Sequence, residues 1–161
     1  HSYGSERRGV FAHELLPYLT ETHDLAIGVG LDPYQPNFGR WPEKIDAIRR
    51  GIVDSVFTQP LFHPSQLDRV LDQTNGTITP SQVFIGSTWV TSAKGRDYWY
   101  RQNAVPLSLL PQGEADDTIR HNSIAQAIDL LHAAASCGCS TYLMLMRGTL
   151  EELQHILSRS R

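Results

Sequence analysis

The sequence has only two cysteines in 161 residues, which argues against a fold held together by disulfides. Cys137 and Cys139 are separated by a single glycine and are too close together to join distant parts of the chain. One such pair is not a zinc ligand set, and the seven histidines show no ligand spacing on one face, so we predict no metal site. These features suit a reducing compartment.

Long apolar runs and clustered basic residues are also absent. No stretch approaches the length of a bilayer span, and the first residues are polar, unlike a signal peptide. Basic and acidic residues are interspersed at a net charge of -3, so no basic face recruits nucleic acid or an anionic membrane. We expect a soluble, cytoplasmic protein with neither partner. Because the chain begins at His1, we expect a fragment, a processed product or part of a longer polypeptide.

What is present is the pattern of an ordinary globular protein. A chain of 161 residues with 40% hydrophobic content can bury one core, so we predict one domain over residues 1–161. Apolar periodicity predicts strands at residues 25–30, 53–59, 82–85 and 142–146. Helices are predicted at residues 9–19, after Pro42, after Pro64, around residues 98–100, and at residues 118–136 and 150–157.

Four strands that are each followed by a helix make half of an eight-stranded barrel. Right-handed crossover connections force such strands to run parallel. Four parallel strands alone leave two open edges and an uncovered inner face, which is costly in water. We therefore predict an α/β fold, the C-terminal (βα)4 half of a TIM-like barrel. Its completion is expected from a longer chain, an N-terminal half barrel or a homo-oligomer.

The stretch from Val56 to Phe62 is the strongest functional signal. It resembles a short buried strand that stops at the polar pair Thr58 and Gln59, before Pro60, which cannot extend a β-ladder. Ligands gather beyond the carboxyl ends of parallel strands, so both polar side chains are predicted to line a site. The alternative is a strand end that carries polar residues by chance.

This strand end, with Gly28–Pro33 and Phe84–Gly86, stands in the order and spacing of methylenetetrahydrofolate reductase. The chain resembles the second half of that barrel along nearly its whole length, and residues 118–136 resemble the long helix before its last strand. The resemblance implies an oxidoreductase of one-carbon metabolism and methionine biosynthesis. Such an enzyme reduces 5,10-methylenetetrahydrofolate to 5-methyltetrahydrofolate with NADH or NADPH, usually through FAD.

The resemblance also implies roles for individual residues. Gln59 matches the family glutamine that hydrogen-bonds the pterin, and a carboxamide suits this task because it both donates and accepts. Phe62 falls in the aromatic segment just after it. Trp99 falls at an aromatic position where a ring stacks on the aminobenzoyl or nicotinamide group, although a core role fits its spacing equally well. Arg147 lies one place from the family's arginine after the last strand.

The flavin-binding pattern departs from the family. An asparagine, an arginine and a lysine hold the flavin there, whereas this chain has Lys44, Ala47 and Ile48, so only Asp32 and Lys44 are assigned to the cofactor. Gly95 stands where a second folate-binding glutamine is expected. The family's acidic proton donor belongs to the first four strands, which leaves the catalytic residue unassigned. Both FAD binding and direct hydride transfer without a flavin are consistent with this pattern.

Two other interpretations stay open. A non-catalytic half barrel that binds or regulates a complete reductase would explain the altered flavin residues and the missing acid. A different barrel enzyme, such as an aldolase-like one, fits less well, because no lysine stands at a strand end to form a Schiff base.

Overall fold

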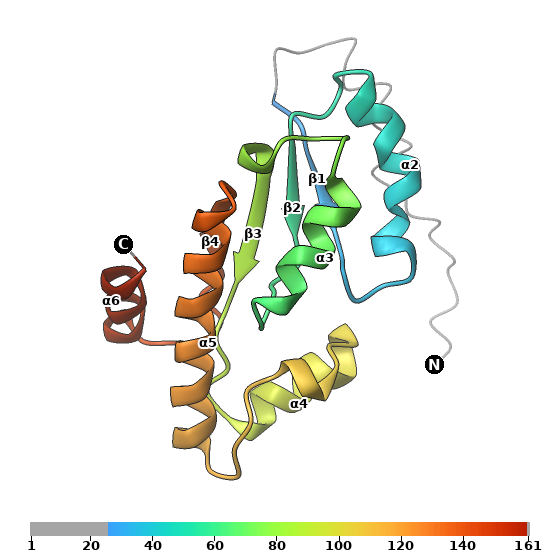
Figure 1. The fold of residues 1–161 in the computed structure, drawn as a ribbon. Helices are drawn as coiled ribbons and strands as arrows, with labels where there is room; N and C mark the ends of the chain where they lie inside the picture. The colour runs from blue at the N-terminus through green and yellow to red at the C-terminus, as the bar shows by residue number, and fades with distance from the viewer. Residues whose placement is uncertain (1–25, 161) are drawn as a thin grey trace, which may run out of the picture.

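The computed structural model describes residues 26–160, which form a four-stranded parallel sheet with helices (Figure 1). The strands β1 (Gly28–Leu31), β2 (Ser55–Thr58), β3 (Val83–Ser87) and β4 (Ser140–Leu143) pair in that order. The helices are α2 (Asn37–Arg49), α3 (Ser65–Thr74), α4 (Ala93–Asn103), α5 (Asp116–Ser136) and α6 (Leu150–Arg159), with 3-10 turns η1 (Pro80–Gln82) and η2 (Leu107–Leu109). The predicted α/β fold with parallel strands is confirmed, and it is compatible with half a barrel. The helix predicted at residues 9–19 lies outside the described residues.

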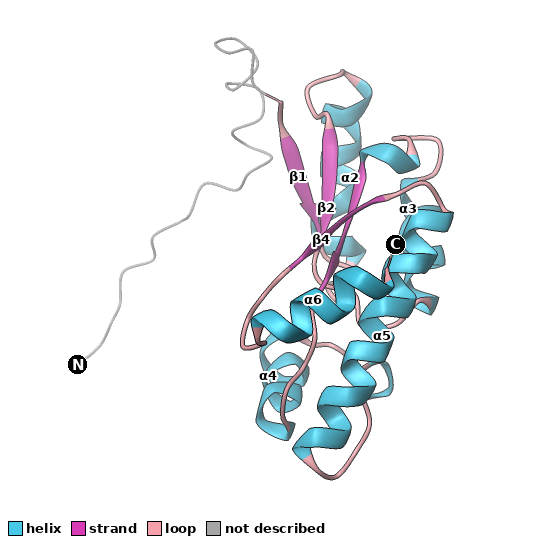
Figure 2. Cartoon of the chain, turned by 90° about the vertical axis from the view of Figure 1, so that its left-hand side faces the viewer, coloured by secondary structure: helices cyan, strands magenta, loops and turns pink. Residues whose placement is uncertain are grey.

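Three helices, α2, α3 and α5, cover one face of the sheet (Figure 2). Alternate strand residues such as Val29, Val56 and Val83 point to this side and are buried against the helices. Alternation follows from the pleat of a strand, which sends neighbouring side chains to opposite faces. Of the helices in residues 26–160, none is long and apolar enough to cross a membrane.

The opposite face of the sheet, called the open face below, carries aromatic rings beside small residues. Phe57 stacks on Phe84 with 4.6 Å between ring centroids, and Tyr142 packs edge-on against Phe57 at 6.0 Å. A side chain at Gly28 would meet the Phe57 ring, since a Cβ there would lie 2.6 Å from it. Phe57 is nonetheless 38% exposed, so this face is less completely buried than the helix-covered one.

The strand predicted at residues 142–146 begins two residues earlier and ends three residues earlier in the structure. In the structure Ser140 pairs with Phe84 and Leu143 with Ser87, the last residue of β3. Beyond that point Met144 still donates its backbone N–H to the Ser87 carbonyl at 2.9 Å, but β4 has ended. Leu145 is exposed in the following loop. The apolar residues 142–146 therefore cover the end of β4 and the loop after it, because β4 can pair only as far as its partner β3 extends.

Helix α2 begins with a left-handed turn. The backbone φ is positive at Asn37, Phe38 and Arg40 (51°, 51° and 64°), so the right-handed helix starts only after Arg40. Pro42 lies inside α2, directly after this turn, rather than at the start of the helix as the sequence predicted. Gly51, with φ of 70°, follows the helix as predicted, in a conformation that glycine adopts without strain.

Candidate functional site

The carboxyl ends of the four strands point toward α4 (Figure 1), and two hollows are lined by residues at or just after these ends. The first, called the polar hollow below, has a volume of about 390 Å³. It is lined by Gly30, Leu31, Asp32, Gln35, Lys44, Phe57, Thr58, Gln59 and Tyr142. It brings together three residues to which the sequence assigned binding roles, Asp32, Lys44 and Gln59.

Gln59 continues β2 on the same side as Phe57. Its backbone N–H donates to the Leu31 carbonyl at 2.8 Å, which fixes the chain direction at the end of the strand. Its side chain is exposed and forms part of the wall of the polar hollow on the open face. The carboxamide therefore faces the solvent-filled hollow, on the side of the sheet that a second half of a barrel would cover.

Thr58, the other polar residue of this strand end, ties β2 to its neighbours. The residue is 2% exposed, and its hydroxyl accepts a hydrogen bond from the Gly86 backbone N–H at 2.9 Å. Its carbonyl accepts one from the Tyr142 hydroxyl, which reaches across β3. Burial raises the pKa of the Tyr142 phenol above its ordinary value, so the hydroxyl stays a donor at neutral pH. Thr58 thus holds three strands together under the hollow.

Lys44 reaches the hollow from α2 rather than from a strand. Its ammonium group donates to the Gly30 carbonyl of β1. Burial lowers the pKa of Lys44, and this effect outweighs the opposite influence of the Glu43 and Asp32 carboxylates. Lys44 thus lies on a helix, and its side chain reaches a strand.

A partly buried tyrosine, Tyr34, fixes the segment that follows Gln59. The Tyr34 hydroxyl donates to the Pro60 carbonyl at 2.8 Å and accepts from Gln66 Nε2 at 2.9 Å. Gln66 Oε1 in turn accepts the backbone N–H of Phe62 at 2.9 Å. Burial strongly raises the pKa of Tyr34, so the phenol stays neutral and keeps both bonds. The loop after β1 and the loop after β2 are therefore held in one arrangement.

The second hollow, called the aromatic hollow below, lies between the loops after β3 and β4 and the start of α4. It has a volume of about 280 Å³. It is lined by Trp89, Val90, Thr91, Lys94, Gly95, Tyr98, Trp99, Met146 and Arg147. Lys94 and Arg147 are exposed cations, and no residue of this lining is acidic. Rings beside two positive charges suit a flat ligand that carries a negative group.

The predicted aromatic residues have different positions in the structure. Trp99 is 6% exposed and lines the aromatic hollow. Phe62 is buried behind it, with its ring edge-on to Trp99 at 5.0 Å between centroids, and lines neither hollow. Phe62 thus supports the position of Trp99 in this structure.

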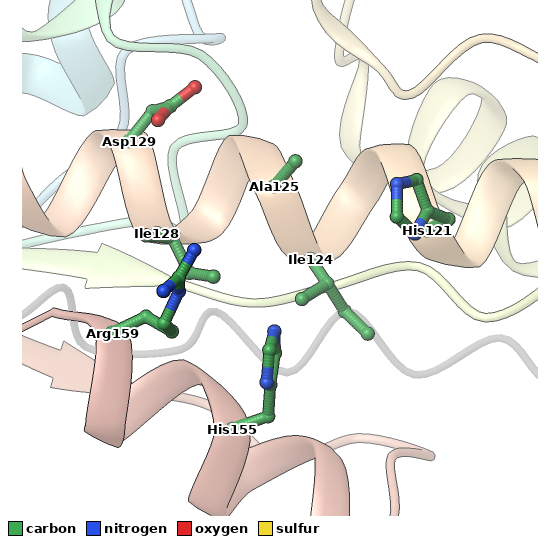
Figure 3. Close-up of a pocket in the computed structure, with 7 residues that line it drawn as sticks. All are labelled: His121, Ile124, Ala125, Ile128, Asp129, His155 and Arg159. Carbon is green, nitrogen blue, oxygen red and sulfur yellow. The ribbon is translucent and has the colours of Figure 1, made fainter.

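A third hollow lies between α5 and α6, on the outer helical layer (Figure 3). Ile124 and Ile128 from α5 line it, with His121 and Asp129 from the same helix and His155 from α6. Within residues 26–160 no group of three histidine, cysteine or acidic residues is placed to hold a metal ion. This groove shares no residue with the two hollows at the strand ends.

Several residues of the two hollows were missed by sequence reasoning, among them Tyr142, Lys94 and Trp89. Tyr142 was read only as part of a buried strand, although alternation along β4 places it on the same side as its partner Gly86. Lys94 and Trp89 lie around a long loop whose path depends on distant contacts. A cation in the first turn of an aromatic-rich helix is the only local signal that pointed to them.

In comparisons with known proteins, no protein-family model matches the sequence, and no curated protein matches it significantly.

Proposed function

We propose that the chain forms half of a methylenetetrahydrofolate reductase-like enzyme, which reduces 5,10-methylenetetrahydrofolate to 5-methyltetrahydrofolate with NADH or NADPH. The observation that supports this proposal most is the polar hollow. Two parallel strands and one helix bring Asp32, Gln59 and Lys44 together there. Such groups gather at strand ends in barrel enzymes, where loops and helices deliver them to one ligand.

The chemistry of the polar hollow suits the edge of a pterin. A pterin edge alternates hydrogen-bond donors with acceptors, and the Gln59 carboxamide offers one of each. The Asp32 carboxylate can accept hydrogen bonds from N–H groups of the pterin, and the Lys44 ammonium can donate one to its carbonyl oxygen. The exposed ring of Phe57 on the same wall supplies a flat apolar surface.

The aromatic hollow suits the remainder of the substrate or the nicotinamide cofactor. Trp99 offers a ring for stacking, and Lys94 and Arg147 offer positive charge to carboxylate or phosphate groups. We propose that either the electron-donating nicotinamide or the aminobenzoyl group of the folate uses this hollow.

The residues at the family's flavin positions do not fit a flavin. Ala47 and Ile48 are 3% and 8% exposed and pack in the core beneath the sheet, so neither can hold a phosphate group. Of the three residues at these positions, Lys44 has a polar side chain, and its ammonium group donates to the Gly30 carbonyl. We therefore propose direct hydride transfer from the nicotinamide to the folate. An absorbance spectrum of the intact protein with a flavin band would contradict this version.

The open face supports the view that the sheet is half of a barrel. Parallel sheets are almost always covered on both faces, and within residues 26–160 helices α2, α3 and α5 cover one of them. We propose that four further strand and helix units cover Phe57, Phe84 and Tyr142. The polar hollow would then open into the mouth of the closed barrel.

Ligand-induced stabilisation tests the proposal. In the intact protein, 5-methyltetrahydrofolate at about 100 times its dissociation constant should add about 2.7 kcal/mol of stability, seen as a rise in melting temperature. Gln59→Ala should weaken this binding about tenfold, because one or two hydrogen bonds are lost. Gln154→Ala, an exposed glutamine on α6, is the matched control and should bind as the wild type does. Absence of any thermal shift in the wild type would overturn the proposal.

One observation favours a second candidate, a non-catalytic half barrel that binds or regulates a complete reductase. Ile27 and Leu31 direct their carbonyls toward β2, so the Gly30 carbonyl points to the outer edge of β1, where Lys44 occupies it. A lysine at an edge protects a sheet against further strand pairing. Gel filtration with a cognate reductase tests this candidate, and failure to co-elute would dispose of it.

A further inference from the structure

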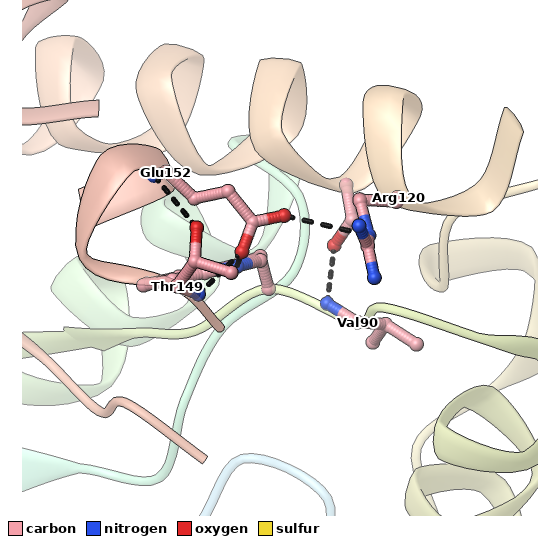
Figure 4. A network of polar contacts seen from close by, with 6 residues as sticks. Val90, Arg120, Thr149 and Glu152 are labelled. Carbon is pink, nitrogen blue, oxygen red and sulfur yellow. Dashed lines mark hydrogen bonds and ion pairs between the residues drawn. The ribbon is translucent and has the colours of Figure 1, made fainter. Parts of the chain in front are cut away.

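Glu152 is a largely buried carboxylate at the centre of a polar network beside the aromatic hollow (Figure 4). Its side chain is 13% exposed, and it lies in the first turn of α6. Oε2 accepts the Thr149 backbone N–H at 2.6 Å, and Oε1 lies 3.4 Å from Arg120 Nε on α5. The Glu152 backbone N–H donates to the Thr149 hydroxyl at 3.2 Å, which completes a capping box.

The capping box alone would need neither a buried carboxylate nor a partner in another loop. Oε2 also accepts from Trp89 Nε1 at 3.3 Å, and Trp89 is a wall of the aromatic hollow. The Trp89 ring lies so close to Gly148 that a Cβ there would be 2.1 Å from it. Glu152 thus holds the loop after β3 directly against the loop after β4.

Two further bonds join the same loops to the rest of the fold. The Val90 backbone N–H donates to the Ser123 hydroxyl of α5 at 2.7 Å, and the Thr88 hydroxyl donates to the Met144 carbonyl at 2.7 Å. These bonds fix the ends of the loops. Glu152 is the group that touches both of them and α5 as well.

We infer that Glu152 is a positioning residue of the aromatic hollow: it sets the separation between the Trp89 wall and the Arg147 wall and so the fit of a flat anionic ligand. Arg147 is directly followed by Gly148 and Thr149, the residues that Trp89 and Glu152 contact. A change at Glu152 therefore moves both walls without removing any residue that lines the hollow. Only the identity of the ligand rests on the proposed function.

The physical reason is preorganisation. A ring and a charged group bind well only if the surfaces that receive them are held at the right spacing, and a displacement of about 1 Å can cost about 100-fold. Glu152 supplies this rigidity because three groups converge on one carboxylate. Its negative charge also lies behind the Trp89 wall rather than in the hollow, where it would repel an anion.

The test compares Glu152→Ala with Glu151→Ala in the intact protein, because a glutamine at position 152 would keep the oxygen that accepts from both Trp89 and Thr149. Glu151 lies in the same turn of α6 but is exposed, so it controls for the lost charge and for the helix terminus. Hydrogen exchange monitors the loops at residues 88–91 and 144–149. We expect faster exchange in both loops for E152A alone, with β1 and β2 unchanged. Unchanged exchange in E152A would overturn the inference whether or not a folate binds.

A double-mutant cycle separates positioning from general destabilisation. Trp89→Phe keeps a ring and removes the N–H that Glu152 accepts. With all variants folded by circular dichroism, calorimetry should show about 10- to 100-fold weaker binding of 5-methyltetrahydrofolate in E152A. The same change made in the W89F background should have a clearly smaller effect. Equal effects in both backgrounds would contradict the inference, whereas a wild type that binds no folate would contradict the proposed function alone.

Discussion

Single side chains that cross from one strand to another hold the open face together. Tyr142 belongs to β4, yet its hydroxyl reaches the Thr58 carbonyl of β2, and the crossing is possible because Gly86 lies between them. A Cβ at Gly86 would lie 2.6 Å from the Tyr142 hydroxyl oxygen. Glycine is needed here for close approach, and the phenol replaces the packing that a side chain at position 86 would provide.

The Tyr142 hydroxyl should therefore carry a pH-dependent part of the stability. Tyr142→Phe should lower the free energy of unfolding by about 0.5–1.5 kcal/mol at pH 8, since one hydrogen bond is lost. Burial raises the Tyr142 pKa, so the folded state keeps a proton that the unfolded state releases above pH of about 10. The stabilisation is present below that pH and is lost as the pH rises through the folded pKa.

Urea unfolding between pH 7 and pH 11 measures this effect. The difference between wild type and Y142F should be constant below pH of about 9 and should shrink above pH of about 10. Tyr100→Phe, at a ring that is 47% exposed on α4, should show neither the loss nor the pH dependence. A difference that grows at alkaline pH would refute the assignment.

At the scale of elements, local patterns predict a helix or strand well but predict poorly what each element contacts. The long helix predicted at residues 118–136 is α5, and the helix predicted at residues 150–157 is α6. The misplaced β4 shows the limit, because its end depends on where β3 ends. The contacts of Glu152 with Trp89 and Arg120 are long-range and have no local signal.

Helix α5 supports the site through one hydroxyl, and this support can be measured. Ser123 is 1% exposed, and its hydroxyl accepts the N–H of Val90, itself 2% exposed. Ser123→Ala leaves that buried N–H without its acceptor, so it should cost about 1–3 kcal/mol in stability. Ser136→Ala, exposed at the end of the same helix, should cost less than about 0.5 kcal/mol. Chemical denaturation with equal m-values compares the two, and equal losses would show that Ser123 does not hold the loop.

At the scale of the whole molecule, the sequence predicted the class of fold, but not the shape of the two hollows at the strand ends. The strand rhythm implied parallel order, and the polar end of β2 marked the polar hollow that the structure contains. Lys44 and Trp89 reach their hollows through side-chain paths that periodicity cannot follow. The predicted half barrel further implies that the open face is an interior surface.

Replacing Phe57 by glutamate tests that implication. If further strands cover the open face in the intact protein, the change buries an unpaired charge and should cost more than about 3 kcal/mol. If water covers it, the change removes only the stacking on Phe84, which is about 0.5–1.5 kcal/mol. Leu157→Glu, at an α6 side chain that is 45% exposed, controls for adding the charge elsewhere. Thermal unfolding separates the two outcomes. A loss no larger than that of L157E would show that the face lies open and would remove the support for a closed barrel.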